Sequence, residues 1–172
     1  MASWEQRFTE LTRDRGAALV RYAYLLCGDR TEAADLVQEA LLRTFGRGRT
    51  GTEVTNIEAY VRRALVAAFV DGRRRQARWR AIRHLIPGPA QVEAAESGVL
   101  HRDELLRASA GLSPRQRACL VLRYYEDMSV AQIADQLGCS AGAVKRHLSD
   151  ALARLAPLLD AATHEQEEGR IP

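Results

Sequence analysis

The residues best suited to contacting a nucleic acid lie in "SAGAVKRHLS", which covers residues 140–149. Lys145 and Arg146 follow several small residues at the start of a predicted helix, and small side chains let a backbone approach a groove edge closely. Cationic side chains placed there can bind phosphates or guanine edges, and helix N-terminal amides also favour phosphates. The candidate contact residues are Ser140, Ala141, Gly142, Lys145, Arg146 and Ser149.

The sequence around this segment predicts a helix-turn-helix motif over residues 128–155. Ser129 and Ser140 are suited to cap its two helices, and Gly138 stands at the turn, where a positive φ is needed. Ala134 is small where the helices must cross closely. Four apolar residues complete the predicted core: Ile133, Leu137, Val144 and Leu148. In this motif the second helix enters the major groove by its N-terminal end; an ordinary helical hairpin with a solvated basic face is the alternative.

The preceding segment, "SPRQRACLVLRYYED", predicts a helix that can support the motif. Ser113 is suited to its N-cap and Pro114 to its first helical position. Leu120, Val121 and Tyr124 form its predicted inner face. The arginines that can hold the DNA backbone are Arg115, Arg117 and Arg123.

A second basic segment, residues 60–83, carries eight arginines and a single acidic residue, Asp71. Basic side chains with aromatics nearby suit single-stranded or opened DNA, because unpaired bases stack on aromatic rings. The alternative is a solvated basic helix that packs against the carboxylates of a neighbour. The candidate residues are Tyr60, Arg62, Arg63, Arg73, Arg74, Arg75, Arg78, Trp79 and Arg80.

Apolar residues at helical spacing predict three helices in the first half of the chain. The first covers residues 4–26 and can break at Gly16. The second follows Thr31, a suitable N-cap, and its apolar stripe is Ala33, Leu36, Val37, Ala40, Leu41 and Phe45. Outside that stripe lie Asp35, Gln38, Glu39 and Arg43. The third begins with a capping box of Thr55 and Glu58.

The clearest boundary is the Pro- and Gly-containing stretch at residues 84–98, which reads as a flexible linker. The predicted fold is therefore all-α, with one helical domain at 1–83, the linker, a second helical domain at 99–160 and a polar tail at 161–172. A repressor needs one DNA-binding domain and a dimer interface. Two different DNA-binding surfaces joined by a flexible linker indicate instead that one chain recognises two DNA elements at a fixed distance.

The composition argues against several other classes of protein. Of the 172 residues, 47% are hydrophobic and only 6% aromatic, which favours helices over sheets. The chain has three cysteines, Cys27, Cys119 and Cys139, which is an odd number, and none of them has CxxC spacing. We therefore expect buried reduced thiols rather than disulfides or zinc ligands. No catalytic triad order, phosphate loop or metal spacing is present, so no enzyme, metal or cofactor is expected. Without a signal peptide or an apolar run of about 20 residues, we expect a soluble cytoplasmic protein with no membrane insertion.

Three segments together resemble the extracytoplasmic-function (ECF) group of bacterial sigma factors, of actinobacterial type. They are "AADLVQEALLRTF", "IEAYVRRALVAAFVDGRRR" and the stretch from Leu112 to Leu155, in the family's order. The resemblance implies sigma domains 2 and 4 and an alternative-sigma transcription initiation factor. Such a factor binds core RNA polymerase, directs it to the −35 and −10 elements of promoters and assists promoter melting. The sequence departs from residues that are frequent in the family at Tyr60, Ala67, Ala68 and Ala143. These departures affect which promoter sequence is expected, but not the expected role.

The resemblance also implies roles for the segments described above. The polar face of Asp35, Gln38, Glu39 and Arg43 is expected to bind the β′ clamp helices of the polymerase, and domain 4 the β flap. The helix at 60–80 is expected to open and read the −10 element, and the helix at 140–149 to read the −35 element. Members of the family commonly pair with an anti-sigma factor, so this partner is expected too.

Two other functions are compatible with the residues alone. A stand-alone dimeric helix-turn-helix repressor with a helical sensing domain would bind duplex DNA without polymerase. A helical adaptor that binds only protein would show no salt-dependent DNA binding.

Overall fold

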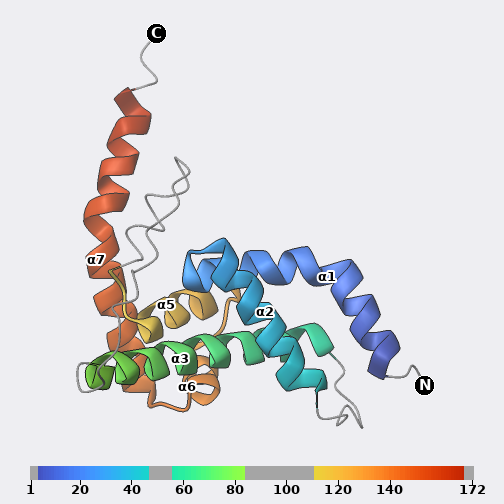
Figure 1. The fold of residues 1–172 in the computed structure, drawn as a ribbon. Coiled ribbons are helices and arrows are strands. Elements are labelled where there is room, and N and C mark those ends of the chain that lie inside the picture. The colour runs from blue at the N-terminus through green and yellow to red at the C-terminus, as the bar shows by residue number, and fades with distance from the viewer. Residues whose placement is uncertain (1–3, 47–55, 84–110, 169–172) are drawn as a thin grey trace. The chain divides into compact units, whose positions relative to one another are not determined.

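The computed structural model describes residues 4–46, 56–83 and 111–168, without the side chains of residues 4, 79–83 and 158–168. Within those ranges every regular element is helical, as predicted (Figure 1). The first of two compact units contains α1 (Trp4–Cys27), α2 (Arg30–Phe45) and the part of α3 (Ile57–Arg83) up to Arg73. The second contains α5 (Pro114–Leu120), the π-helix η1 (Val121–Tyr125), most of α6 (Val130–Leu137) and α7 (Ala141–Glu168). The predicted linker at 84–98 lies outside the described residues.

The core of the first unit is built from apolar stripes on its three helices. The stripe predicted on α2 is confirmed, because its buried residues are Ala33, Leu36, Val37, Ala40, Leu41 and Phe45. The fully buried side chains of α1 and α3 include Leu19, Tyr22, Leu26, Val61, Leu65 and Val66. Figure 1 shows α1 and α2 side by side. Helical spacing alone was therefore enough to place the α2 part of this core.

The N-caps of two helices differ from the sequence prediction. Asp29, not Thr31, caps α2, since its Oδ1 accepts a hydrogen bond from the Glu32 amide at 2.8 Å. At α3 the Asn56 Oδ1 accepts from the Ala59 amide at 3.0 Å. The Thr55 named in the predicted capping box lies outside the described residues. Asp, Asn, Ser and Thr are comparable N-caps, so neighbouring candidates in one sequence compete and geometry decides between them.

The helix α1 is continuous from Trp4 to Cys27, so the break considered at Gly16 is wrong. A glycine inside a helix costs about 1 kcal/mol relative to alanine. Leu11 and Leu19, on either side of Gly16, are both buried. Burial of one leucine contributes about 2 kcal/mol, so packing outweighs the local preference.

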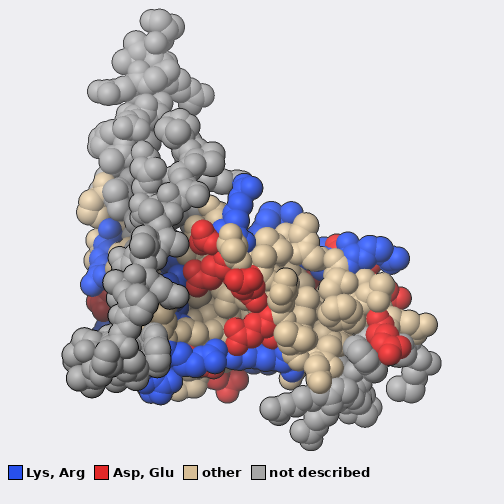
Figure 2. Space-filling view, in the orientation of Figure 1, with Lys and Arg blue, Asp and Glu red and all other residues tan. Residues whose placement is uncertain are grey.

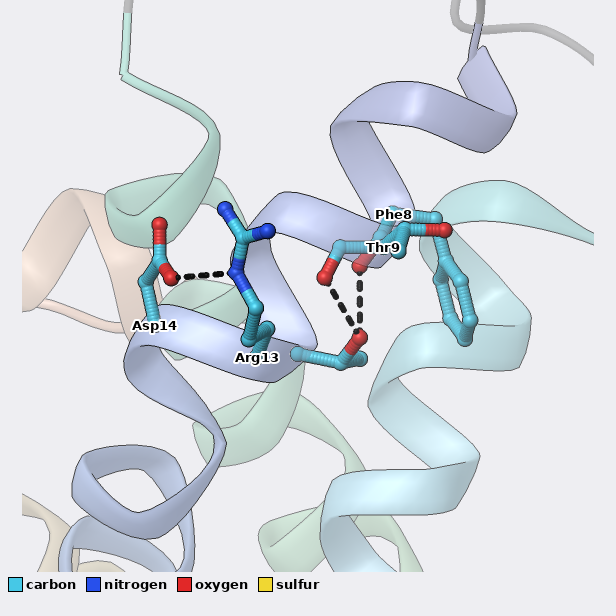
Figure 3. A network of polar contacts seen from close by, with 5 residues as sticks. Phe8, Thr9, Arg13 and Asp14 are labelled. Atoms are coloured by element: carbon cyan, nitrogen blue, oxygen red, sulfur yellow. Dashed lines mark hydrogen bonds and ion pairs between the residues drawn. The ribbon is translucent and has the colours of Figure 1, made fainter.

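Polar contacts line the exposed side of α1 near its N-terminus (Figure 3). The Thr12 hydroxyl donates to the Phe8 carbonyl at 2.8 Å, and Arg13 pairs with Asp14 at 2.9 Å. Exposed ion pairs of this kind add little stability. Phe8 itself meets Phe45 of α2 edge to face, with ring centroids 5.2 Å apart, and this aromatic contact helps to join that end of α1 to α2.

The core of the second unit lies between α5 and α7. A buried cluster, with Leu120 packed against it, consists of Leu112, Ala151 and Leu155. Ser113 caps α5, and its reciprocal hydrogen bonds with Gln116 confirm the predicted start of this helix, with Pro114 in the first turn.

The helical period changes at η1, where the Glu126 amide donates to the Val121 carbonyl at 3.2 Å. A π-turn holds more residues than an α-turn, so the face that points inward shifts along the sequence. Leu122 is buried, while Tyr124 is 64% exposed. The prediction that Tyr124 lies on the inner face was wrong because it assumed an unbroken α-helical period.

The helix α7 is long and continues beyond the predicted second domain to Glu168. The first part of the polar tail predicted from residue 161 is therefore helical. Pro157 lies inside α7, where it removes one main-chain hydrogen bond. Among the described residues, no helix has the length and apolarity that crossing a membrane requires.

Candidate nucleic-acid interface

The helix-turn-helix predicted in the second unit is present in the structure. Ser129 caps α6, where it exchanges hydrogen bonds with Gln132 at 2.8 and 3.3 Å. The Ser140 Oγ caps α7 by accepting from the Ala143 amide at 3.1 Å. Gly138 has φ +60°, the left-handed value expected at the turn. Three of the predicted core residues and Ala134 are buried: Ile133, Val144 and Leu148.

The first turns of α7 present the predicted −35 residues to solvent. Ala141, Lys145 and Ser149 follow one another at i, i+4 spacing, and Gly142 and Arg146 form the adjacent row. All five are exposed, as is the capping Ser140. Apart from its chain neighbours and the backbone of its own helix, a Cβ at Gly142 would meet only the Ser140 Oγ within 4 Å, at 3.9 Å. The start of α7 thus presents exposed small and cationic side chains.

The three arginines that precede the helix-turn-helix differ in how far they are buried. Arg117 is buried, with 8% of its surface exposed, so the expectation that it holds the DNA backbone is corrected. Arg115 is half-buried on α5. Arg123 is also half-buried, and its Nη1 donates to the Met128 carbonyl at 2.8 Å.

Two arginines of α3 are engaged within the first unit. Arg62 pairs with Glu58 at 2.6 Å and lies over the Tyr22 ring, 5.3 Å from its centroid. Arg15 of α1 also contacts Glu58, at 3.1 Å. Arg73 reaches Glu32 of α2 at 2.7 Å. These contacts hold α3 against α1 and α2. The Arg73–Glu32 pair is the kind of contact expected in the alternative given above, a basic helix that packs against the carboxylates of a neighbour.

The other predicted residues of α3 lie on its outer side. Tyr60 is 49% exposed, and four arginines are exposed: Arg63, Arg74, Arg75 and Arg78. The side chains of Trp79 and Arg80 lie outside the described residues. Figure 2 shows a band of basic side chains along α3 on the face that is turned to the viewer. The exposed basic residues of α3 and those at the start of α7 are the two candidate surfaces for DNA.

The outer face of α2 combines charge with one large apolar side chain. Asp35 and Gln38 are exposed. Arg43 pairs with Glu39 at 2.6 Å and also lies 3.8 Å from Asp71 of α3. Leu42 is 69% exposed on the same face. Sequence reasoning missed Leu42, although it follows Gln38 at i+4 and falls outside the buried stripe.

Two cysteines are buried and protonated at neutral pH. Burial raises the pKa of the Cys27 thiol from 9.0 to about 11, and its Sγ donates to the Asp29 carbonyl at 3.2 Å. Burial likewise raises the pKa of Cys119 to about 11, with a smaller contribution from nearby Cys139. Because the thiolate is the reactive form, both are structural thiols, as expected. Cys139 is partly exposed.

Comparison with known proteins gives matches over both halves of the chain. Residues 11–84 match the family model for Sigma-70 region 2, and residues 102–155 match that for Sigma-70, region 4. The RNA polymerase sigma-E factor of Streptomyces coelicolor is 38% identical over 168 residues, 94% of this chain and 93% of the relative. The ECF RNA polymerase sigma factor SigL of Mycobacterium tuberculosis is 34% identical over 151 residues, 83% of this chain and 82% of the relative.

A solved structure also shares the fold. It is the sigma factor RpoE in complex with the anti-sigma factor NepR from Bartonella quintana, with a TM-score of 0.64 and 24% identity. The match covers 90% of this chain and 97% of that one. At this identity the likeness concerns the fold alone.

Proposed function

The chain belongs to the ECF group of RNA polymerase sigma factors, and from that premise we propose how its two units divide promoter recognition. It is an alternative sigma factor, which binds core RNA polymerase and promoter DNA. The matches over both halves give no support to the stand-alone repressor. Catalysis, in this proposal, belongs entirely to the polymerase, and the factor acts where the polymerase does, in the cytoplasm.

The proposed domains are those expected from the sequence: domain 2 over 1–83, a linker over 84–98, domain 4 over 99–160 and a tail over 161–172. Domain 4 reads the −35 element by the start of α7. Lys145 and Arg146 bind phosphates or guanine edges, while Ala141 and Gly142 let the helix approach the bases. The observation that carries this assignment is the uncovered row of small and cationic residues on a capped helix.

Domain 2 binds the −10 element along the outer side of α3. Exposed Tyr60 supplies a surface on which an unpaired base can stack. Arg74 and Arg78 are exposed and supply positive charge to the DNA backbone. Arg62 and Arg73 contribute from within, because Arg62 lies over the Tyr22 ring of α1 and Arg73 pairs with Glu32 of α2, and both contacts hold α3 on the other helices.

The outer face of α2 is the proposed contact with the β′ clamp helices of the polymerase. Interfaces of this kind have an apolar centre and a polar rim. Leu42 supplies the centre, while Asp35, Gln38, Glu39 and Arg43 form the rim. Domain 4 would contact the β flap. An anti-sigma factor is the proposed regulator, by analogy with the solved complex of a sigma factor and an anti-sigma factor.

A gel-shift experiment with and without core polymerase tests the proposal. We expect the chain alone to bind promoter duplex weakly, and the complex with core polymerase to bind it tightly and in a sequence-dependent way. Tight and specific binding by the chain alone would contradict the proposal and favour the repressor. An absence of binding in both cases, at low salt, would favour a protein-only adaptor.

A further inference from the structure

We propose that Arg123 is a positioning residue for the −35 reader, not a contact to the DNA backbone. Its guanidinium joins η1 to Met128, the residue before the Ser129 cap of α6, and so fixes the direction in which the helix-turn-helix leaves the rest of domain 4. The inference rests on the proposed reading of the −35 element by α7. It replaces the expectation, from charge alone, that Arg123 holds a phosphate.

Three hydrogen bonds close the connection between η1 and α6. The Arg123 Nη1 donates to the Met128 carbonyl at 2.8 Å. The Met128 amide donates in turn to the Leu122 carbonyl at 3.0 Å, and the Glu126 amide to the Val121 carbonyl at 3.2 Å. Met128 is therefore held at both its amide and its carbonyl. A hydrogen bond from a charged donor is about twice as strong as a neutral one, so the Arg123 contact is a strong element of this closure.

The turn itself has a demanding backbone. Asp127 has φ 52°, and among the described residues it is the sole non-glycine with positive φ. Aspartate tolerates the left-handed region better than most side chains, yet the conformation still costs free energy. Such a conformation persists when the surrounding contacts hold it, and the Arg123–Met128 hydrogen bond immediately follows it. Ser129 directly follows Met128 and caps α6 through its capping box. The turn and the helix are therefore connected without a flexible residue between them.

The consequence for DNA reading follows from the order of the elements. Residues of α6 precede the turn at Gly138, and α7 begins directly after it, so a change in the direction of α6 displaces the start of α7. Sites that recognise a ligand lose affinity when their residues move by about 1 Å. A phosphate contact acts differently, because it adds affinity for any DNA sequence and increases the salt dependence.

The test uses the complete chain bound to core polymerase, with Arg123→Met, which removes every N–H but keeps an apolar stem. Binding is measured on a mapped promoter and on the same promoter with its −35 element scrambled. We expect the variant to bind the intact promoter about tenfold more weakly, the effect of losing about one base contact when the recognition helix is displaced. We expect unchanged binding to the scrambled promoter and an unchanged salt slope there.

Arg154→Met is the matched control. The Arg154 Nη1 also donates to a main-chain carbonyl, that of Gly111, at 2.6 Å, but this contact does not touch the connection to α6. We expect this control to bind both promoters like the wild type. Equal weakening on both promoters by Arg123→Met, with a salt slope lower by about 1, would show a phosphate contact and overturn the proposal. Normal binding by Arg123→Met to both promoters would also overturn it.

A second pair of variants changes Asp127, the residue before Met128, and leaves Arg123 in place. These variants disturb the position of the Met128 carbonyl and serve as the test if Arg123→Met does not fold. Asp127→Val and Asp127→Asn lose the same charge, but a β-branched residue disfavours the positive φ that asparagine accepts. We expect Asp127→Val to lose discrimination between intact and scrambled promoters relative to Asp127→Asn. Equal discrimination by the two would contradict the proposal. If the wild type does not distinguish the two promoters, the assignment of the −35 reader fails, which is a separate result.

Discussion

Leu42 is the residue whose position is hardest to explain by the fold alone. It is a large apolar side chain, 69% exposed, and its helix already buries a complete stripe on the other face. We predict that Leu42→Ala lowers the affinity for core polymerase about tenfold, because apolar anchors near the centre of an interface carry much of its binding free energy. Affinity can be measured by titration of labelled factor with core enzyme.

The control for this prediction is Leu25→Ala, which truncates another exposed leucine, on α1. Both variants should keep the thermal stability of the wild type, since neither side chain belongs to a core. An equal loss of polymerase affinity in the two, or none in Leu42→Ala, would contradict the placement of the contact on α2.

The buried thiols give a prediction about pH. The folded-state pKa values of Cys27 and Cys119, about 11, lie above the ordinary value of 9.0. The stability that these thiols contribute is therefore complete below pH 9 and is lost as the pH rises through about 11. We predict a fall in melting temperature across this range that is smaller in Cys27→Ala/Cys119→Ala. If the melting temperature of the double variant falls as much, relative to its own value at neutral pH, the fall does not come from these thiols, which would contradict their raised pKa values.

At the scale of elements, helix caps offer the cleanest test of the structure. Asp29→Ala should lower the free energy of unfolding by about 1 kcal/mol, because it leaves the Glu32 amide without its capping acceptor. Thr31→Ala, two residues along, is the matched control and should change little. Chemical denaturation of the two variants measures the difference. A larger loss in Thr31→Ala would mean that α2 begins later than the structure shows.

Which elements form could be predicted from the sequence, while some of their details could not. The stripe of α2 and the caps Ser113, Ser129 and Ser140 follow from local patterns, and the structure confirms them. The π-helix could not be predicted, since periodicity assumes one period throughout, and Tyr124 was misplaced as a result. Gly16 was misjudged because local propensity ignores the packing that holds α1 together.

The candidate surfaces were predicted less completely than the fold. Charge patterns located both basic surfaces, but they could not separate arginines that face solvent from those used inside the protein. Arg117 is buried, and Arg73 is paired with Glu32 across 41 residues of sequence. Such contacts depend on how helices pack, which a single sequence does not specify. Leu42 was missed because only polar residues were sought outside the stripe.

At the scale of the whole molecule, one chain carries both of the proposed DNA-binding surfaces. Inserting about five base pairs between the −35 and −10 elements turns them to opposite sides of the duplex, since one turn contains about 10 base pairs. We predict that this insertion reduces transcription by more than about tenfold, although both elements stay intact. Promoter templates of different spacing, transcribed with the reconstituted enzyme, provide the measurement. Transcription that does not depend on the spacing would mean that the elements are read independently.

The most direct test of the central claim is run-off transcription in vitro. Purified chain would be mixed with core RNA polymerase and fragmented genomic DNA of its own organism, and the start sites of the transcripts mapped. The account predicts discrete start sites that share sequence elements near −35 and −10 and that disappear when the chain is omitted. An absence of such transcripts, together with tight binding of the chain alone to duplex DNA, would contradict it.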